Sequence, residues 1–408
     1  MSLVKINIIK NFIYLVITKG VDFLVPVILL PYLVNALGIE QFGLLSFSLA
    51  IGVYFSSLMQ YGYNISAVRT IARLRDDNYQ LAVAFSELLT SSVLICLFFS
   101  LCFMFIFLVE EIYSQFYLYI SVLLFVLMQS LFPAWLFQGL EKMHYIALSN
   151  SLCKFLYLIS ILYWVHSSDD TYLVPLLQGI SWAIALLIAV IIIFKKKLTY
   201  FVLPTWRGIK ETYRLGWPAF VTQFAPTLYS NSMTFILGIF HGNVVVGVYS
   251  AAIRVIEILN ALAFLFVNAA LPLLSRNITL HKWLKNIMIV VGVSLGIIVY
   301  FTSEWFVPML FSEHIDKIVM LIKVASPMIP LVFCRLAYGP AYLMLIGEEK
   351  IYKRIVFLAA SIGFIAAWFI IPNWQVEGAV FIMLSTSLLM TILTLVSVAR
   401  LSPHIKKG

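Results

Sequence analysis

The chain has 408 residues, of which 62% are hydrophobic and only 11% are charged, and its mean hydropathy is +1.01. Soluble domains carry about 25% charged residues, so this composition excludes an ordinary globular enzyme and predicts a protein that crosses a membrane many times. The apolar runs are continuous rather than alternating, which argues against an outer-membrane β-barrel.

Twelve apolar runs, separated by clusters of charge, are each long enough to cross a bilayer as a helix. The predicted spans are Ile8–Val34, Phe42–Ile65, Leu81–Val109, Phe116–Gly139, Tyr145–Val165, Tyr172–Phe194, Leu215–Phe240, Val244–Leu274, Ile287–Phe306, Ile318–Ile346, Ile351–Ile371 and Val376–Ala399. The first run is too long for a cleavable signal peptide, so we expect it to remain as the first span. The sequence therefore predicts an all-α polytopic membrane protein with twelve transmembrane helices.

Basic residues gather on one side of the predicted membrane. If the N-terminus is cytoplasmic and the spans alternate, 21 of the 27 Lys and Arg residues fall on the inner side, including the run Lys195–Lys197. The predicted outer loops instead carry acidic residues such as Asp169 and Asp170. This asymmetry follows the positive-inside rule and predicts that both termini are cytoplasmic. It also explains the net charge of +9 without nucleic acid as a partner.

The two halves of the chain share short motifs in the same order. Residues Leu37-Gly38-Ile39 recur 200 residues later as Leu237-Gly238-Ile239. The pair Gly43 and Ser46 recurs 204 residues later as Gly247 and Ser250. We interpret these repeats as a duplication of six spans that keeps both halves in one orientation. The predicted division is an N-terminal six-helix bundle over residues 1–197, a cytoplasmic linker over 198–214 and a C-terminal six-helix bundle over 215–408, with a cleft between the bundles.

Charged side chains inside the predicted spans are the main candidates for function. A charge at that depth costs roughly 2.5–3.5 kcal/mol on insertion scales, so it usually faces a partner or a water-filled cavity. Lys19 and Asp22 stand three residues apart in the first span, and Arg254 and Glu257 repeat that spacing in the eighth. Each pair also has an alternative interpretation as a salt bridge that holds two helices together. The charges that lie away from the ends of the spans are Lys19, Lys154, Arg254, Lys323 and Arg335 against Asp22, Glu87 and Glu257. This excess of cations favours an anionic cargo such as a phosphate head group.

Motifs for enzymatic chemistry are missing from the sequence. There is no P-loop, no nucleophile elbow and no metal-ligand spacing among the six histidines and four cysteines. We therefore expect a transporter rather than an enzyme, with no resident cofactor or metal.

Two stretches near the N-terminus carry a family resemblance. Pro31-Tyr32-Leu33, followed by Leu37-Gly38 and Phe42-Gly43, resembles the N-terminal signature of the Wzx-type O-antigen and polysaccharide flippases. Tyr61-Gly62-Tyr63-Asn64, with Ser66-Ala67-Val68-Arg69 and Ile71-Ala72, is similar to that family's second signature. These flippases belong to the multidrug/oligosaccharidyl-lipid/polysaccharide exporter superfamily.

The resemblance implies a fold of two six-helix bundles around a central V-shaped cavity. It implies that the chain moves undecaprenyl-pyrophosphate-linked repeat units from the cytoplasmic to the outer leaflet of a bacterial inner membrane by alternating access. Its other implied partners are membrane lipid, the polysaccharide polymerase and the chain-length regulator. We expect the substrate contacts at Lys19, Arg254, Arg335, Lys154, Tyr61 and Asn64, and coupling to H⁺ or Na⁺ at Asp22 and Glu257.

Two alternatives stay open at this point. A multidrug exporter of the same superfamily would favour an acidic rather than a cationic cavity. A membrane enzyme such as an O-antigen polymerase usually needs a sizeable extramembrane loop with catalytic residues, and the predicted spans leave no loop of that size.

Overall fold

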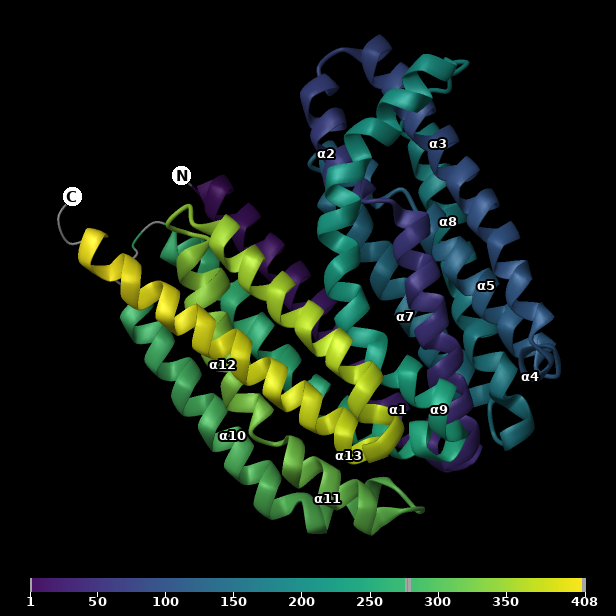
Figure 1. Ribbon diagram of the computed structural model, residues 1–408. Helices are drawn as coiled ribbons and strands as arrows, with labels where there is room; N and C mark the ends of the chain where they lie inside the picture. Colours follow the sequence, from purple (N-terminus) through teal and green to yellow (C-terminus); the bar gives the residue numbers. More distant parts are fainter. Residues whose placement is uncertain (1, 276, 278–279, 406–408) are drawn as a thin grey trace. The chain divides into compact units, whose positions relative to one another are not determined.

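The computed structural model describes residues 2–275, 277 and 280–405, with side chains from residue 24 to residue 401 except at 222, 225–226, 228–230, 269, 272–273, 276 and 278–279. Every regular element in this part of the chain is helical (Figure 1). The all-α prediction is therefore confirmed for the described residues. Continuously apolar sequence leads to this result because a helix satisfies its backbone hydrogen bonds internally, as a bilayer interior requires.

Nine helical segments of the described chain are long and apolar enough to cross a membrane. Three helices, α1 (Ser2–Gln60), α9 (Trp206–Leu274) and α13 (Glu349–Ile405), each contain two predicted spans and are kinked between them. The kinks lie at Gly38, Gly242 and Gln375, whose φ angles are 75°, 75° and 46°. With these three helices counted twice, the helices of the described chain cover the positions of the twelve predicted spans.

The remaining elements are shorter and follow the other predicted spans. They are α2 (Tyr63–Leu74), α3 (Asn78–Met104), η1 (Phe105–Leu108), α4 (Glu110–Tyr113), α5 (Phe116–Leu131), α6 (Ala134–Gly139), α7 (Met143–Trp164), η2 (Ser168–Tyr172), α8 (Leu173–Lys195), α10 (His281–Leu310), α11 (Ile315–Ala325), α12 (Met328–Tyr338) and η4 (Gly339–Leu343).

Local sequence explains where two of these helices begin and end. The Asp77 side chain accepts hydrogen bonds from the backbone N–H groups of Tyr79 and Gln80, both at 3.0 Å, and so caps the N-terminus of α3. Pro133 separates α5 from α6. The residue before it, Phe132, is extended with ψ at 120°, because a following proline disfavours the helical conformation.

The chain forms two compact units that are not simply its two halves. Unit 1 comprises Met1–Leu29 and Ser48–Thr227, and unit 2 comprises Leu30–Phe47 and Leu228–Gly408. Helices α1 and α9 therefore each contribute to both units. The predicted division into two six-helix bundles, joined by a linker over residues 198–214, is a different kind of division and stays a prediction.

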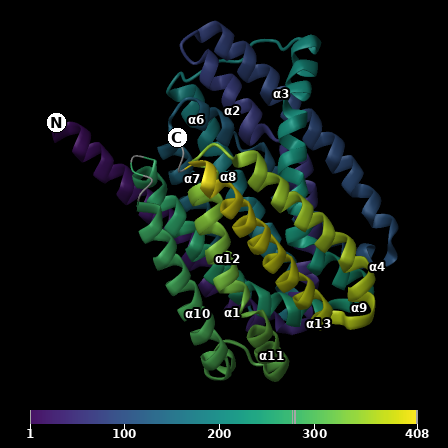
Figure 2. The same ribbon diagram turned by 60° about the vertical axis from the view of Figure 1, so that its left-hand side comes forward.

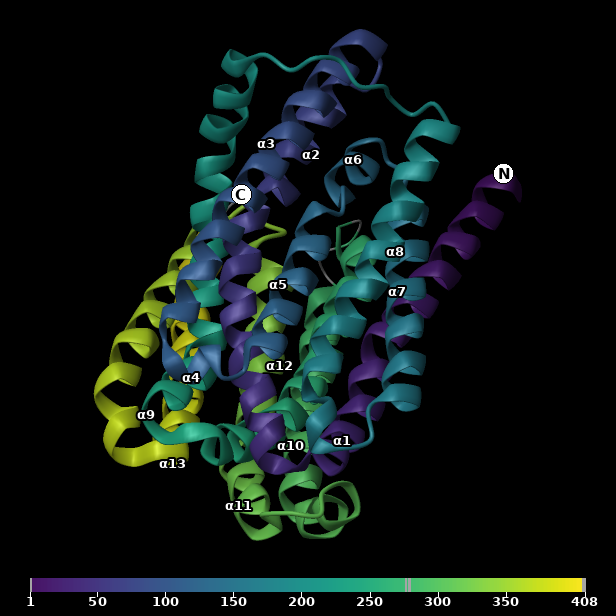
Figure 3. The ribbon, with the colours of Figure 1, turned by 90° about the vertical axis from the view of Figure 1, so that its right-hand side faces the viewer.

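Within unit 1, α8 packs against both α5 and α7, and α2 packs against α6 (Figure 3). Its buried core includes Ile71, Phe85, Leu136, Phe137 and Ile193. Within unit 2, α12 packs against α10 and α13, and α11 packs against α10 (Figure 2). Large apolar side chains on the outer faces remain exposed, as is expected where lipid rather than water surrounds the helices.

Unit 2 contains a reciprocal crossing of α1 and α9. A Cβ atom on Gly43 would lie 1.8 Å from the carbonyl oxygen of Asn243, and one on Gly247 would lie 2.0 Å from the carbonyl oxygen of Ile39. Both partners are related by the same offset of 204 residues (247 − 43 and 243 − 39). Such reciprocity is the mark of local two-fold symmetry, and it supports the predicted duplication.

The kinks correct one detail of that duplication. Gly242, not Gly238, has the backbone conformation of Gly38, and it stands at the 204-residue offset. The sequence-based pairing of Gly38 with Gly238 is therefore wrong. Gly238 lies within the helical part of α9, where a Cβ atom would approach the Phe47 ring to 2.1 Å. It is a packing glycine, whereas Gly38 supplies a positive φ that other residues rarely adopt.

The turn between α10 and α11 holds the kink of α1 in place. The backbone N–H of Ile39 donates to Glu313 Oε2 at 2.9 Å, directly after Gly38. The Asn35 side chain donates to the Leu310 carbonyl at 2.8 Å and accepts from the Ser312 backbone N–H at 3.1 Å. The helix end created by the kink thus receives acceptors and donors from outside the helix.

Candidate functional site

The predicted charged stripe of the eighth span lies on α9 in unit 2. Arg254 and Glu257 are both exposed, one helical turn apart, and Ser250 at the start of the stripe is buried. Neither charged side chain forms an ion pair or hydrogen bond with another described residue. The two charges still act on each other electrostatically, but no ion pair within 4 Å joins them, so a ligand or an ion could approach either one.

Arg335 lies on α12 of the same unit and is half-buried. One terminal nitrogen contacts the Met390 thioether on α13 at 2.5 Å, and the Nε atom is buried without a hydrogen-bond partner among the described residues. A guanidinium has five N–H donors, and a thioether is a weak acceptor. Arg335 is thus a poorly satisfied cation, and an anion would supply the acceptors that it lacks.

Lys154 lies on α7 of unit 1, next to the buried Cys153, and is half-buried. Tyr61 and Asn64 belong to the same unit, whereas Arg254 and Arg335 belong to unit 2. The predictions for Lys19 and Asp22 fall on side chains outside the described part of the chain.

Tyr61 packs among aromatic rings at the junction of α1 and α2. It has a positive φ of 44°, as does the following Gly62 at 72°. Its ring stacks on Phe220 with centroids 5.4 Å apart, and it meets Tyr63 and Tyr213 edge-on at 5.8 Å each. A Cβ atom on Gly62 would lie 2.4 Å from the Phe220 nitrogen, so the turn needs glycine to let α9 approach.

Asn64 instead begins a chain of hydrogen bonds that runs through unit 1. Its amide donates to Gln60 Oε1 at 2.9 Å, the Gln60 amide donates to Ser56 Oγ at 2.8 Å, and Ser56 Oγ donates to Gln129 Oε1 at 3.2 Å. The chain links α2, α1 and α5.

These amides line a cavity of about 200 Å³ inside unit 1, which we call the amide cavity. Its lining comes from α1, α2, α3, α5, α6, α7 and α8 and consists of Gln60, Tyr63, Asn64, Ser92, Gln129, Ser130, Phe132, Ala134, Trp135, Ile146, Asn150 and Trp182. None of these side chains carries a charge. The sequence pointed to Asn64 only. The other residues carry no charge, so the pattern of charged residues does not indicate them; their signal is an uncharged polar residue inside an apolar span.

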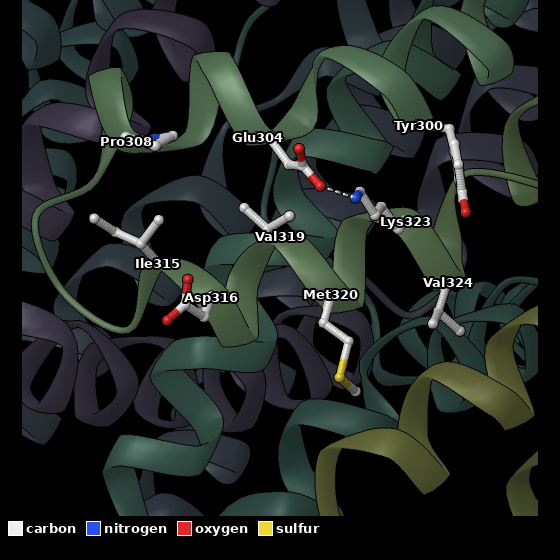
Figure 4. Close-up of a pocket in the computed structure, with 9 residues that line it drawn as sticks. All are labelled: Tyr300, Glu304, Pro308, Ile315, Asp316, Val319, Met320, Lys323 and Val324. Atoms are coloured by element: carbon white, nitrogen blue, oxygen red, sulfur yellow. Dashed lines mark hydrogen bonds and ion pairs between the residues drawn. The ribbon is translucent and has the colours of Figure 1, made fainter.

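A second cavity, of about 560 Å³, lies between α10 and α11 in unit 2 (Figure 4). Lys323 and Glu304 form an ion pair across it, and the Lys323 ammonium also lies 5.6 Å from the centroid of the Tyr300 ring. Lys323 is thus neutralised within unit 2, so it is a weaker candidate for cargo binding than Arg335.

Two further charged groups have structural partners at the end of unit 1 that carries α2. Glu87 accepts a hydrogen bond from Thr205 Oγ1 at 2.9 Å, beside the N-terminus of α9, where a negative charge is stabilised by the helix dipole. Arg75 forms an ion pair with Glu141 at 2.5 Å, and the hydrogen bond and charge of this carboxylate raise the pKa of the guanidinium.

No group of three or more His, Cys, Asp or Glu side chains that could hold a metal ion is found in the described part of the chain. Apolar helices of membrane length that carry charged side chains are a feature of membrane transporters. The fold agrees with that class. It is similar to the lipid II flippase MurJ in an inward closed conformation, with a TM-score of 0.71 over 94% of this chain and 87% of that one, at 13% identity. It is also similar to an inward-facing MATE family multidrug transporter of the MOP superfamily, with a TM-score of 0.65 over 93% and 99% of the two chains, at 13% identity.

Sequence comparison then gives the family. The profile of the polysaccharide biosynthesis protein family matches residues 8–278, and the chain belongs to this family. It is 24% identical over 405 residues to a protein of Escherichia coli strain K12 named "Putative O-antigen transporter", covering 97% of both chains. It is 26% identical over 408 residues to a protein of the same name from Shigella dysenteriae, covering 95% of this chain and 99% of the relative.

Proposed function

We propose that this protein is a flippase that moves undecaprenyl-pyrophosphate-linked O-antigen or related polysaccharide repeat units from the cytoplasmic to the outer leaflet of a bacterial inner membrane. The observation that carries the proposal is the similarity, over nearly the full length, to two relatives named as O-antigen transporters. The likeness to a lipid II flippase supports the fold that such a function would need.

The charges of the described residues are consistent with this cargo. A lipid-linked repeat unit joins an apolar tail, an anionic pyrophosphate and a polar sugar chain. Arg254 is exposed and unpaired among the described residues, and Arg335 lacks a strong acceptor. A phosphate offers both the charge and the several acceptor oxygens that these guanidinium groups can bind. In this proposal Lys19 and Lys154 add to the same attraction, while the tail stays in lipid.

Directional export requires a source of free energy beyond cargo binding. In our proposal the protein alternates between an inward-open and an outward-open state. Binding of H⁺ or Na⁺ at Asp22 and Glu257 shifts the equilibrium between these two states. The exposure of Glu257, without an ion-pair partner among the described residues, supports its role as such a site.

Proteoliposomes that contain a fluorescent undecaprenyl-pyrophosphate-linked oligosaccharide test the function. Translocation is measured as the fraction of sugar that becomes accessible to an impermeant lectin. We expect Arg254→Gln and Arg335→Gln to lower the rate by about tenfold or more, the effect of losing a charged hydrogen bond, and Arg254→Lys to retain part of it. Lys353→Gln is the matched control, because Lys353 is exposed and pairs with Glu349 on the same helix. Failure of the wild-type protein to translocate the oligosaccharide, with export of cationic drugs instead, would refute the proposal.

A further inference from the structure

We propose that the amide cavity of unit 1 is a sugar-binding subsite that holds one uncharged monosaccharide ring. The inference rests on the proposed function and deepens it, because it assigns a place in this chain to part of the cargo that the charged residues do not explain.

The chemistry of the lining fits an uncharged polyol. Four side-chain amides, from Gln60, Asn64, Gln129 and Asn150, face the cavity together with serine hydroxyls, and no Lys, Arg, Asp or Glu joins them. An amide both donates and accepts hydrogen bonds, as a sugar hydroxyl does. A charged ligand would find no counter-ion here, and a hydrocarbon would leave the amides unsatisfied.

Ser130 supplies an independent sign that a ligand belongs in the cavity. It is only 7% exposed, and its hydroxyl has no hydrogen-bond partner among the described residues. Helical serines commonly bond back to the carbonyl four residues earlier, as Ser121 of the same helix does to Tyr117 at 2.6 Å. A buried hydroxyl without a hydrogen bond destabilises a protein. A ligand that forms a hydrogen bond with Ser130 would remove this free-energy cost.

The hydrogen-bond chain also orients the amides in advance. Because Gln129 Oε1 accepts from Ser56, the Gln129 amide N–H₂ at one end of the chain remains as a donor. Because the Asn64 N–H₂ donates to Gln60, Asn64 Oδ1 at the other end remains as an acceptor. Asn150, on α7, makes no hydrogen bond to another described residue. Polar groups fixed by their own neighbours lose little freedom when a ligand binds.

The aromatic rings and the volume of the amide cavity also suit a sugar ring. Trp135 and Trp182 line the cavity, and Phe132 meets Trp182 edge-on with centroids 5.6 Å apart. The C–H face of a pyranose can pack on such rings, while its hydroxyls reach the amides. At about 30 Å³ per water molecule, the cavity of about 200 Å³ corresponds to about seven waters, which is the scale of a single sugar ring.

The position of the cavity agrees with capture of cargo before transport. Its lining includes the first residues of α2, and this helix also carries Arg69 and Arg73, which the positive-inside rule assigns to the cytoplasmic side. In the proposed function the repeat units are taken up from that side.

Direct binding of free sugars to the purified full-length protein tests the subsite. The probes are N-acetylglucosamine, galactose and rhamnose at millimolar concentration, observed by saturation-transfer NMR, with acyclic sorbitol as the negative probe. We expect saturation transfer to at least one pyranose, and a two- to tenfold weaker affinity, about the effect of one hydrogen bond, in Ser130→Ala and Asn150→Leu.

The matched control is Ser149→Ala. Ser149 is another buried serine whose hydroxyl has no described partner, it adjoins Asn150 on α7, and it does not line the cavity. Ser149→Ala should bind sugar as the wild type does. The melting temperature of Ser130→Ala should stay equal or rise, since the change removes an unsatisfied hydroxyl, and this separates lost binding from misfolding.

Absence of pyranose binding by the wild type, or full binding by Ser130→Ala and Asn150→Leu, would overturn the subsite. The vesicle assay distinguishes this from failure of the proposed function. If the wild type translocates the lipid-linked oligosaccharide and both variants do so at the same rate, only the subsite is refuted. If the wild type binds sugar through Ser130 and Asn150 yet translocates no oligosaccharide, the subsite is supported and the flippase function is refuted.

Discussion

Adding one methyl group at Gly43 should break the crossing of α1 and α9. A Cβ atom there would lie 1.8 Å from the Asn243 carbonyl oxygen, against 3.4 Å or more in ordinary contact, so the helices would have to separate by about 1.6 Å (3.4 − 1.8). The obstacle is backbone, which cannot rotate away as a side chain does. Overpacking costs about 1–3 kcal/mol and occasionally more, so we take about 3 kcal/mol here. The better helix propensity of alanine returns about 1 kcal/mol, which leaves a loss of about 2 kcal/mol for Gly43→Ala.

The assay is thermal melting of the detergent-solubilised protein, followed by fluorescence-detected gel filtration. Gly296→Ala is the control, because this helical glycine would place its Cβ atom 3.0 Å from Pro330 Cδ and 3.4 Å from the Ser326 carbonyl oxygen, so the neighbours need to move by only a few tenths of an ångström. We expect a melting temperature several degrees below wild type for Gly43→Ala and little change for the control.

The symmetry of the crossing adds a second arm. Gly247→Ala should cost about as much as Gly43→Ala, and the double variant should cost less than the sum, because both methyl groups push the same two helices apart. Equal melting of Gly43→Ala and Gly296→Ala would refute the reasoning, and so would strict additivity of the two changes at the crossing.

Three further outcomes follow from other parts of the chain. Cysteine introduced at Ser168 should react with an impermeant maleimide in intact cells and cysteine at the exposed Asp76 should not; equal labelling would contradict the predicted orientation. Asp77→Ala should lower the free energy of unfolding by about 1 kcal/mol through loss of the α3 cap, seen as a lower melting temperature, and Asp77→Asn should restore most of it. Glu257→Gln should abolish the response of translocation to an imposed pH or sodium gradient while cargo binding persists; a preserved response would remove Glu257 from coupling.

The membrane-length helices of the described chain could be predicted, because long apolar runs allow almost no structure except helices inside a bilayer. The kinks could not. Gly38 was visible as part of a repeat, but only the structure shows that its conformational partner is Gly242, four residues beyond the matching letters. Gln375 carries no local signal at all for its positive φ of 46°.

The candidate site also has a part that the sequence indicates and a part that it does not. Arg254 and Arg335 are candidates on the sequence alone, because a charge inside an apolar run is costly and therefore conspicuous. The amide cavity could not be predicted, because each helix contributes only one or two uncharged polar groups and nothing in the sequence indicates that Gln129 and Asn150 face one space. For Tyr61 the family motif suggested substrate contact, and the structure adds that its ring stacks on Phe220, so its role in binding stays a prediction.

The crossing in unit 2 also limits how this chain can change during evolution. Each of its two glycines stands five residues after a kink, Gly43 after Gly38 and Gly247 after Gly242. Inserting or deleting one residue between kink and crossing would turn the helix by about 100° and carry the glycine away from the contact. Substitutions in the segments 38–43 and 242–247 can accumulate one at a time. A change of length in one segment would shift only one of the two glycines at the crossing, so the other segment would need the same change. We therefore expect natural variants of this chain to differ in composition between kink and crossing but to keep the spacing fixed.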